Sequence, residues 1–268
     1  MRLKLHLSAD VNNAVLPLNY QYPLSAAIYK IIGKADEDYA FFLHKQGYQK
    51  TDSRKTFKLF TFSDLNTPFN IKGDRMIMQT RHAQFTICFH VPEAATNFIK
   101  GLFQYQHIEL ADKKSKAMFT VQQVEILPLW HVPALSGQIK EVVFKPISPM
   151  VTGTIDEKGH YCFIAPNEAS FIPTLLHHWK EKYAVVYGKD EADHDFAAIE
   201  LTVLNADKAK SRLITIKADT PQQTRIRGFV GFLLKVKAKV KVLELALDAG
   251  IAVYGSLGMG SVEVVGEG

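Results

Sequence analysis

Residues 224–242 carry apolar side chains at most even positions and cations at six odd positions, and this pattern constrains the fold more than any other segment. The even positions hold Ile226, Val230, Phe232, Leu234, Val236, Ala238, Val240 and Val242. The odd positions hold Arg225, Arg227, Lys235, Lys237, Lys239 and Lys241. Because successive side chains of a strand point to opposite faces, the run predicts one long strand over residues 224–240. Its even face belongs in a core beneath a sheet.

The cationic face of this strand has two interpretations. Side chains on one face of a strand lie about 7 Å apart, which is close to the phosphate spacing of an extended nucleic acid. The six cations are therefore predicted to bind RNA phosphates. The alternative is an edge strand whose lysines prevent pairing with other chains.

The first half of the sequence predicts strands and helices in the order βαββαβ, with additional elements. This order is typical of a ferredoxin-like domain. Gly33 is expected to end the first helix, and Pro92 lies near the start of the last. The expected strands are residues 2–8, 58–64 and 76–90, with two more in 107–127, and the expected helices are 24–32, 36–46 and 94–105.

The second half repeats this order without a visible sequence repeat. Pro128 and Pro133 interrupt any regular element in residues 127–133, so the junction is placed there. The expected strands are 141–146, 160–165, a hairpin of 197–204 with 212–218, the long strand and 261–265, and the helices are 170–187 and 243–249. The sequence thus predicts an α+β protein of two tandem ferredoxin-like domains, residues 1–128 and 129–268.

Composition agrees with a folded protein that has an acidic partner. The 268 residues are 47% hydrophobic, enough for two cores, and the net charge of +5 suits nucleic acid. No run reaches the roughly 18 apolar residues of a membrane span, so we expect a cytoplasmic protein without a membrane segment. Cys88 and Cys162 are too few for a disulfide framework or a cysteine metal site, and both are expected to be buried thiols.

Residues 250–260 form a glycine-rich segment. Glycine allows positive φ and close approach of backbones, so such a loop can offer N–H groups to phosphates. No Gly-Lys-Ser/Thr follows, and the segment precedes a strand rather than a helix, which excludes a Walker loop and a dinucleotide fingerprint. We therefore expect the glycines Gly250, Gly258 and Gly260 to contribute to RNA binding.

The same segment resembles the G-φ-G-x5-G-φ-G signature of the repeat-associated RNA-binding superfamily. Gly250-Ile251-Ala252 is followed by five residues and then by Gly258-Met259-Gly260, with Ala252 departing from the pattern. Length, the doubled order of elements and the position of the motif make the whole chain similar to the sixth family of CRISPR-associated proteins. This resemblance implies two ferredoxin-like domains and an endoribonuclease that cuts precursor CRISPR RNA within its repeats.

The resemblance also implies a catalytic trio of Tyr, His and Lys in the first domain. Tyr29, His44 and Lys50 match it, because His44 follows Tyr29 by fifteen positions and Lys50 follows His44 by six. Other residues of the same types lie nearby and stay open as alternatives, namely Tyr39, Tyr48 and Lys45.

These residue types suffice for cleavage of RNA by its own 2′-hydroxyl. A histidine that titrates near pH 6.5 can serve as base or acid, Lys50 can stabilise charge on the phosphate, and Tyr29 can donate a hydrogen bond or act as acid. Which of Tyr29 and His44 handles which proton stays open. The expected products carry a 2′,3′-cyclic phosphate and a 5′-hydroxyl, and no metal or other cofactor is required.

Other polar clusters are given structural interpretations. Asp193-His194-Asp195 is expected to be a hydrated turn, and the neighbouring His177 and His178 are expected to diverge on a helix, so no metal site is predicted. A second basic cluster can pair phosphates and stack bases or can be a solvated loop; it comprises Lys45, Lys50, Arg54, Lys55 and Lys58 with Tyr48 and Phe57 interleaved.

The leading hypothesis is a metal-independent endoribonuclease whose partner is CRISPR repeat RNA. The alternative is a non-catalytic RNA-binding subunit of a CRISPR effector complex. A third hypothesis is a ferredoxin-like protein without an RNA role, against which the glycine motif argues. The oligomeric state stays open, with a homodimer as one option.

Overall fold

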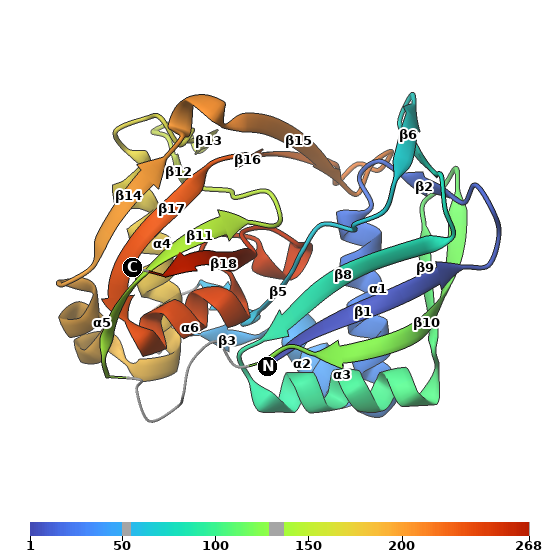
Figure 1. Ribbon diagram of the computed structural model, residues 1–268, viewed down its shortest axis with the longest axis horizontal. Helices are drawn as coiled ribbons and strands as arrows, with labels where there is room; N and C mark the ends of the chain where they lie inside the picture. Colours follow the sequence, from blue (N-terminus) through green and yellow to red (C-terminus); the bar gives the residue numbers. More distant parts are fainter. Residues whose placement is uncertain (50–54, 129–136, 268) are drawn as a thin grey trace.

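The computed structural model describes residues 1–49, 55–128 and 137–267, which form two α/β halves (Figure 1). The first half is built on a five-stranded antiparallel sheet in the order β5-β8-β1-β10-β9. Its strands are β1 (Arg2–Ala9), β5 (Phe60–Phe62), β8 (His82–Phe89), β9 (His107–Ala111) and β10 (Lys116–Ile126). The strands β1, β5, β8 and β10 have the fourth-first-third-second order of a ferredoxin-like domain.

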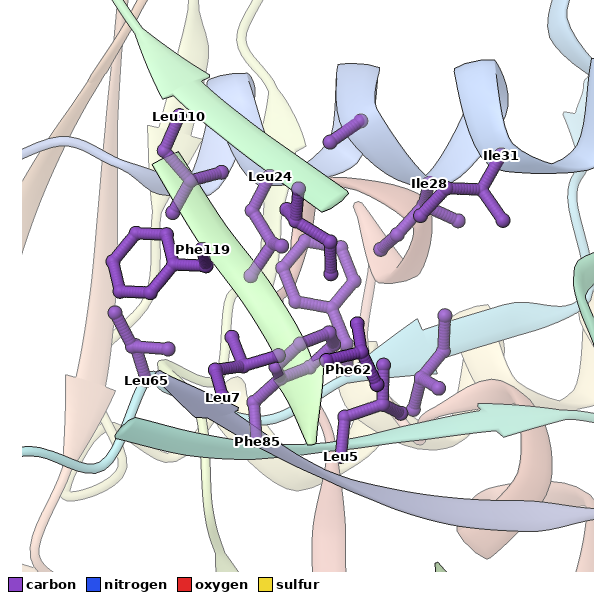
Figure 2. Close-up of a cluster of buried hydrophobic side chains, with 14 of the residues drawn as sticks. Leu5, Leu7, Leu24, Ile28, Ile31, Phe62, Leu65, Phe85, Leu110 and Phe119 are labelled. Atoms are coloured by element: carbon purple, nitrogen blue, oxygen red, sulfur yellow. The ribbon is translucent and has the colours of Figure 1, made fainter. Parts of the chain in front are cut away.

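Helices α1 (Gln21–Ala35) and α3 (Pro92–Gln104) supply the other layer of this half. β1 alternates buried and half-buried residues along its whole length, so one face of the sheet is covered. Figure 2 shows Leu24 and Ile28 of α1 directed toward Leu5, Phe85 and other side chains of that face. The ferredoxin-like fold predicted for the first half is confirmed.

The first helix is longer than the sequence predicted. It begins before Pro23 and continues through Gly33 to Ala35. A Cβ at Gly33 would lie 3.4 Å from the Cβ of Ala40, so the glycine allows the next helix to pack closely instead of ending this one. That next helix is α2 (Glu37–Lys45), and Asp36 caps it by accepting a hydrogen bond from the Tyr39 N–H at 2.8 Å.

Small sheets decorate the first half. One contains β2 (Val15–Pro17), β6 (Phe69–Lys72) and β7 (Arg75–Met78). The other pairs β3 (Tyr48–Gln49) with β4 (Thr56–Phe57). The predicted strand 76–90 is therefore two strands, β7 and β8, that belong to different sheets.

The second half repeats the ferredoxin-like order in a four-stranded sheet, β14-β17-β11-β18. Its strands are β11 (Ile139–Pro146), β14 (Glu200–Leu204), β17 (Leu233–Lys239) and β18 (Val262–Glu267). The helices are α4 (Phe171–Tyr187), α5 (Lys189–Phe196) and α6 (Val240–Ala249). Trp179 and Tyr183 of α4 pack with Val142 and Leu234 in the core of this half. The predicted tandem architecture is confirmed.

The long strand predicted for residues 224–240 is wrong in one respect. It is two strands, β16 (Thr224–Val230) and β17, which separate at Gly231 with φ +85°. The predicted hairpin of 197–204 with 212–218 is also wrong, because β14 pairs with β17 while β15 (Lys210–Ile216) pairs with β16. The even face is nevertheless buried as predicted, including Ile226, Phe232 and Leu234.

The pair β15–β16 extends from the second half toward the first (Figure 1). The Arg212 guanidinium lies 2.7 Å from the Asp64 carboxylate, and the Thr215 N–H donates to the Asn19 side chain at 3.0 Å. The pair therefore ties the halves together and carries residues of the second half over the first.

The remaining elements are short. β12 (Gly153–Ile155) pairs with β13 (Tyr161–Phe163), and two single turns of 3₁₀ helix are η2 (Ala206–Lys208) and η3 (Gly255–Leu257). The predicted junction 127–133 falls largely outside the described residues, so the boundary between residues 128 and 129 stays a prediction. None of the described helices is long and apolar enough to cross a membrane. Cys88 is buried as predicted, but Cys162 is exposed.

Candidate active site

Tyr29 lies where α1 meets the glycine-rich segment of the second half. Ser25 and Tyr29 are one turn apart on α1 and therefore share a face. The Ser25 hydroxyl donates to the Ser256 carbonyl at 2.6 Å, and the Ser256 side chain lies close enough to the Tyr29 hydroxyl to lower its pKa. Burial raises the pKa of Tyr29 to about 12, so its hydroxyl keeps its proton at neutral pH.

His44 meets Tyr29 from the last turn of α2. The two rings are 5.0 Å apart between centroids and perpendicular, while Phe60 contacts the Tyr29 ring at 5.6 Å. The pKa of His44 is lowered, first by desolvation and then by the positive charges of Lys45, Lys58 and Lys217. Its imidazole is exposed and neutral at neutral pH, which allows it to accept a proton.

Two cations not assigned to the catalytic trio contribute to this site. The Lys58 ammonium donates to the His44 carbonyl at 3.0 Å, so it lies beside the end of α2. Lys217 follows β15 and acts on His44 from the second half. The site thus places a neutral base, a protonated phenol and positive charge close together.

The other predicted trio member, Lys50, lies outside the described residues. Of the alternatives, Tyr39 and Tyr48 hydrogen-bond each other through their hydroxyls at 2.9 Å, and Tyr39 is buried. Lys45 is exposed next to His44 and contributes to its electrostatic environment. Among the three tyrosines that the sequence offered, Tyr29 is therefore the one whose ring contacts His44.

The glycine-rich segment packs against the edge strand β5 of the first half. A Cβ at Gly258 would lie 2.3 Å from the Phe62 ring, and one at Gly250 would lie 3.2 Å from the Thr61 hydroxyl oxygen. Both glycines have φ +75°. The Thr61 hydroxyl also donates to the Met259 carbonyl at 3.2 Å. The glycines thus allow the close contact between the halves that brings Ser256 to Tyr29.

Internal hydrogen bonds already occupy two of the predicted phosphate donors. The Gly258 N–H donates to the Gly255 carbonyl, and the Gly260 N–H donates to the Pro149 carbonyl, both at 2.9 Å. Ala252, the departure from the motif, lies 2.7 Å from where a Cβ of Gly260 would be. A direct RNA contact by Gly250, Gly258 and Gly260 stays a prediction.

The lysines of the predicted cationic strand all have acidic neighbours. Lys235 pairs with Glu141 at 2.8 Å, and Lys237 pairs with Glu200 at 2.7 Å. Lys239 and Lys241 both pair with Asp195, at 2.6 and 2.9 Å, and Lys241 also belongs to α6 rather than to the strand. Their role in RNA binding stays a prediction, and an incoming phosphate would compete with these carboxylates.

Asp195 is not part of a hydrated turn, which corrects the sequence interpretation. It lies in α5 with a fully buried side chain, accepts from the Tyr183 hydroxyl at 2.6 Å and pairs with Lys239 and Lys241. Burial opposes its charge, but the hydrogen bonds from these lysines and Tyr183 lower its pKa to about 2. Because Asp195 has charged neighbours in the sequence, its burial among ion-pair partners could not be predicted from the sequence.

Arg225 and Arg227 differ from the lysines. Both are exposed on β16, and neither has an ion-pair partner within the described parts of the chain. Since β16 extends toward the first half, these guanidiniums are available to an external anion. Their predicted RNA contact is untested, and their geometry is compatible with it.

His177 and His178 do not diverge as expected, because their rings lie 5.6 Å apart. With Glu181 they place ligand atoms within 4.8 Å of one another. The Lys55 ammonium already contacts the Glu181 carboxylate and lies 3.3 Å from the His178 Nδ1. A metal ion would have to displace this lysine, so the chain itself supplies the positive charge there.

Comparison with known proteins identifies the family to which this chain belongs. Residues 15–125 match the model of the CRISPR-associated protein Cas6 N-terminal family, and residues 133–264 match that of the CRISPR associated protein Cas6 C-terminal family. The chain belongs to the Cas6 family. A CRISPR-associated endoribonuclease Cas6 of Methanocaldococcus jannaschii is 29% identical in an alignment that covers 98% of this chain and 92% of the relative.

Further Cas6 relatives agree with this assignment. A CRISPR-associated endoribonuclease Cas6 of Pyrococcus furiosus is 24% identical over 94% of this chain and 84% of the relative. A solved CRISPR associated protein Cas6 has a TM-score of 0.70 at 26% identity and covers 99% of both chains. A Cas6-related protein from Pyrococcus furiosus has a TM-score of 0.79 at 18% identity, covering 99% of this chain and 98% of its own, which shows the fold alone.

Sequence reasoning missed Ser256 and Lys217 as members of the site of this Cas6 chain. Ser256 is the only serine of the glycine-rich segment, a signal that was present but carried no indication of its contact with Tyr29. Lys217 carries no local signal at all, because only the placement of β15–β16 brings it toward α2. Lys58 was assigned to the basic cluster but not to His44.

Proposed function

We propose that this protein is a metal-independent endoribonuclease that binds precursor CRISPR RNA and cuts it within the repeats. The contact of Tyr29 with His44 inside a group of lysines carries the proposal, because it combines a base, an acid and positive charge. The names of the Methanocaldococcus jannaschii and Pyrococcus furiosus relatives support an endoribonuclease.

His44 acts as the base in this proposal. Its neutral imidazole removes the proton of a ribose 2′-hydroxyl, and the resulting oxygen attacks the adjacent phosphorus. A bond from phosphorus to the 2′-oxygen forms while the bond to the 5′-oxygen of the next nucleotide breaks. The products are a 2′,3′-cyclic phosphate and a 5′-hydroxyl.

Tyr29 acts as the donor to the leaving 5′-oxygen. Its raised pKa keeps the phenol protonated, and the perpendicular contact with the His44 ring places the phenol beside the base. Lys58 and Lys217 supply charge near the site, and Lys50 is proposed as a further cation at the phosphate. Each assignment follows from the proton state or charge that the reaction needs at that atom.

The RNA approaches along cations outside the site. We propose that Arg225 and Arg227 contact phosphates first, since both are exposed and lack carboxylate partners within the described residues. The lysines Lys235, Lys237, Lys239 and Lys241 contribute further positive charge. For Lys235 and Lys237 the phosphate competes with the accessible carboxylates of Glu141 and Glu200. Backbone donors of the segment from Gly250 to Gly260 are proposed to complete the contact.

The test is cleavage of labelled repeat RNA in excess EDTA, with a matched RNA whose ribose at the cut carries hydrogen in place of the 2′-hydroxyl. The proposal expects undiminished cleavage in EDTA, cyclic phosphate ends and no cleavage of the deoxy RNA. Cleavage that stops in EDTA or persists on the deoxy RNA would contradict the mechanism. Binding without any cleavage would instead support a non-catalytic subunit of a CRISPR effector complex.

A further inference from the structure

A cavity of about 800 Å³ opens between α4, the segment that contains β4 and β5, and the glycine-rich segment. This volume falls within the roughly 300–1,000 Å³ of small-ligand sites. Its walls combine aromatic and basic side chains, among them Lys55, Phe57, Tyr161, His178, Tyr254 and Ser256. No aspartate or glutamate lines it within the described part of the chain. A ligand with a flat apolar body and a negative charge fits this chemistry.

The aromatic rings of the cavity are placed for stacking. Tyr254 and Tyr161 are 6.3 Å apart between ring centroids, and the Lys55 ammonium lies 5.5 Å from the centre of the Phe57 ring. Tyr254 is 37% exposed although it belongs to a loop packed between the halves, so its ring can accept a further flat group. Aromatic side chains of this kind stack with unpaired bases regardless of base identity.

The cavity adjoins the candidate active site. Ser256, which lies near the Tyr29 hydroxyl, and Phe60, whose ring contacts that of Tyr29, both line the cavity. Lys58, which donates to the His44 carbonyl, lines it as well. Whatever occupies the cavity is therefore next to the group that reacts.

The floor of the cavity is held by a buried lysine. The Lys182 ammonium donates to the carbonyls of Ala249 and Ala252 at 3.0 and 3.1 Å, and to that of Gly250. These bonds fix the start of the glycine-rich segment and hence the direction in which Tyr254 leaves it. The aromatic wall is therefore built into the fold before any ligand binds.

We propose that this cavity binds one unpaired nucleotide of the RNA, next to the phosphate that is cut. The base stacks on Tyr254, and the phosphate of the same nucleotide lies toward Lys58 and toward Lys55, where it competes with the Glu181 carboxylate. The inference rests on the proposed function, because the adjoining Tyr29 and His44 define which phosphate is meant. An unpaired nucleotide is required, since a base within a helix cannot leave its stack to enter a cavity.

The test measures binding of repeat RNA in which each nucleotide in turn lacks its base. The protein carries His44→Ala, so that the RNA stays intact. One position beside the cut is expected to weaken binding about 10-fold when its base is missing, the size of a lost stacking contact. Adding Tyr254→Ala should abolish this loss, because the stacking partner is gone in both cases, whereas Tyr254→Phe should retain it.

Control variants separate this effect from general damage. Tyr105→Ala removes another exposed tyrosine, at the end of α3 and outside the cavity, and should leave the base-dependent loss unchanged. Ile155→Glu, at a lining residue that is 70% exposed, needs no core rearrangement and should weaken RNA binding by adding a negative charge to a cavity that takes an anionic nucleotide. Full-strength binding by Ile155→Glu would overturn the proposal.

A base-dependent loss that is the same with and without Tyr254 would also overturn it. Saturable binding of free AMP that leaves RNA binding unaffected would assign the cavity to a mononucleotide instead and would overturn it as well. The two proposals fail separately. If the wild-type protein cuts the RNA but no missing base causes a Tyr254-dependent loss of binding, only the nucleotide-binding role of the cavity is rejected. If such a loss is found but the wild-type protein never cuts the RNA, only the endoribonuclease activity is rejected.

Discussion

His44 and Tyr29 are in opposite proton states at neutral pH, which determines how the reaction should depend on pH. Desolvation, and then positive charge, lowers the pKa of His44 below its usual 6.5, while burial raises that of Tyr29 to about 12. A base works when deprotonated and an acid when protonated. At neutral pH both residues are therefore in the form that the proposed assignment requires.

The single-turnover cleavage rate should rise as the pH increases through the lowered pKa of His44. It should then stay level through neutral pH, because His44 is already deprotonated and Tyr29 is still protonated. The rate is measured at saturating RNA and constant ionic strength. A rate that falls as the pH rises above the pKa of His44 would show that the histidine is the acid and would reverse the assignment.

At the scale of elements, the glycine-rich segment acts through packing. Gly258→Ala would introduce a methyl group 2.3 Å from the Phe62 ring at φ +75°. We expect a loss of about 2–4 kcal/mol in the free energy of unfolding, from overpacking and backbone strain together. Denaturant unfolding monitored by tyrosine and tryptophan fluorescence measures it.

Gly73→Ala is the matched control for this substitution. Its φ is +62°, but no atom lies within 4 Å of the added methyl group, so only the backbone strain of about 1 kcal/mol is expected. Equal losses for the two variants would show that contact with Phe62 is not what requires glycine at position 258.

The arginines of β16 should account for part of the salt dependence of RNA binding. Each phosphate contact with single-stranded RNA contributes about 0.7 to the slope of log K against log salt concentration. Replacing Arg225 and Arg227 by glutamine should reduce this slope by about 1.4 if each contacts one phosphate. An unchanged slope would show that Arg225 and Arg227 of β16 do not contact RNA phosphates.

Lys235→Gln and Lys237→Gln are the comparison on β17. Each lysine already pairs with a glutamate, so RNA gains less from it, and a smaller change in slope is expected. A larger reduction of the salt slope in the lysine variants than in the arginine variant would indicate that β17, as the sequence alternation predicted, makes the main contact with RNA phosphates.

The alternation in residues 224–242 predicted the faces of these strands but not their pairing. Every even residue of β16 and β17 that the pattern assigned to the core, apart from the half-buried Val230, is buried. The break at Gly231 was hidden because the even positions on both sides of it, Val230 and Phe232, stay apolar. Sheet membership depends on hydrogen bonds to distant strands, which a periodicity cannot specify. The ion pairs of the lysines were hidden for the same reason.

At the scale of the whole molecule, the site is assembled from both halves. Tyr29 and His44 belong to helices of the first half, and their spacing along the chain, read through the family resemblance, was enough to pair them. Ser256 and Lys217 arrive from the second half through the glycine-rich segment and β15. Residues brought together by packing of two domains share no sequence spacing, so this part of the site required the structure.

Lys217 provides a test of this arrangement. Lys217→Gln removes a positive charge that lowers the pKa of His44, so that pKa should rise. The rising limb of the rate against pH should then move to higher pH by a few tenths of a unit, the scale of a screened surface interaction. Lys210→Gln, at the start of β15, should leave the limb in place. If the rising limb does not move in Lys217→Gln, Lys217 of the second half does not lower the pKa of His44.

The central claim is that His44 performs the chemical step of RNA cleavage. The most direct measurement is the single-turnover rate on repeat RNA for His44→Ala, beside His194→Ala, which changes an exposed histidine of α5 outside the site. We predict a loss of about 10²–10⁴-fold for His44→Ala with RNA binding retained, and an unchanged rate for His194→Ala. A wild-type rate in His44→Ala would contradict the account.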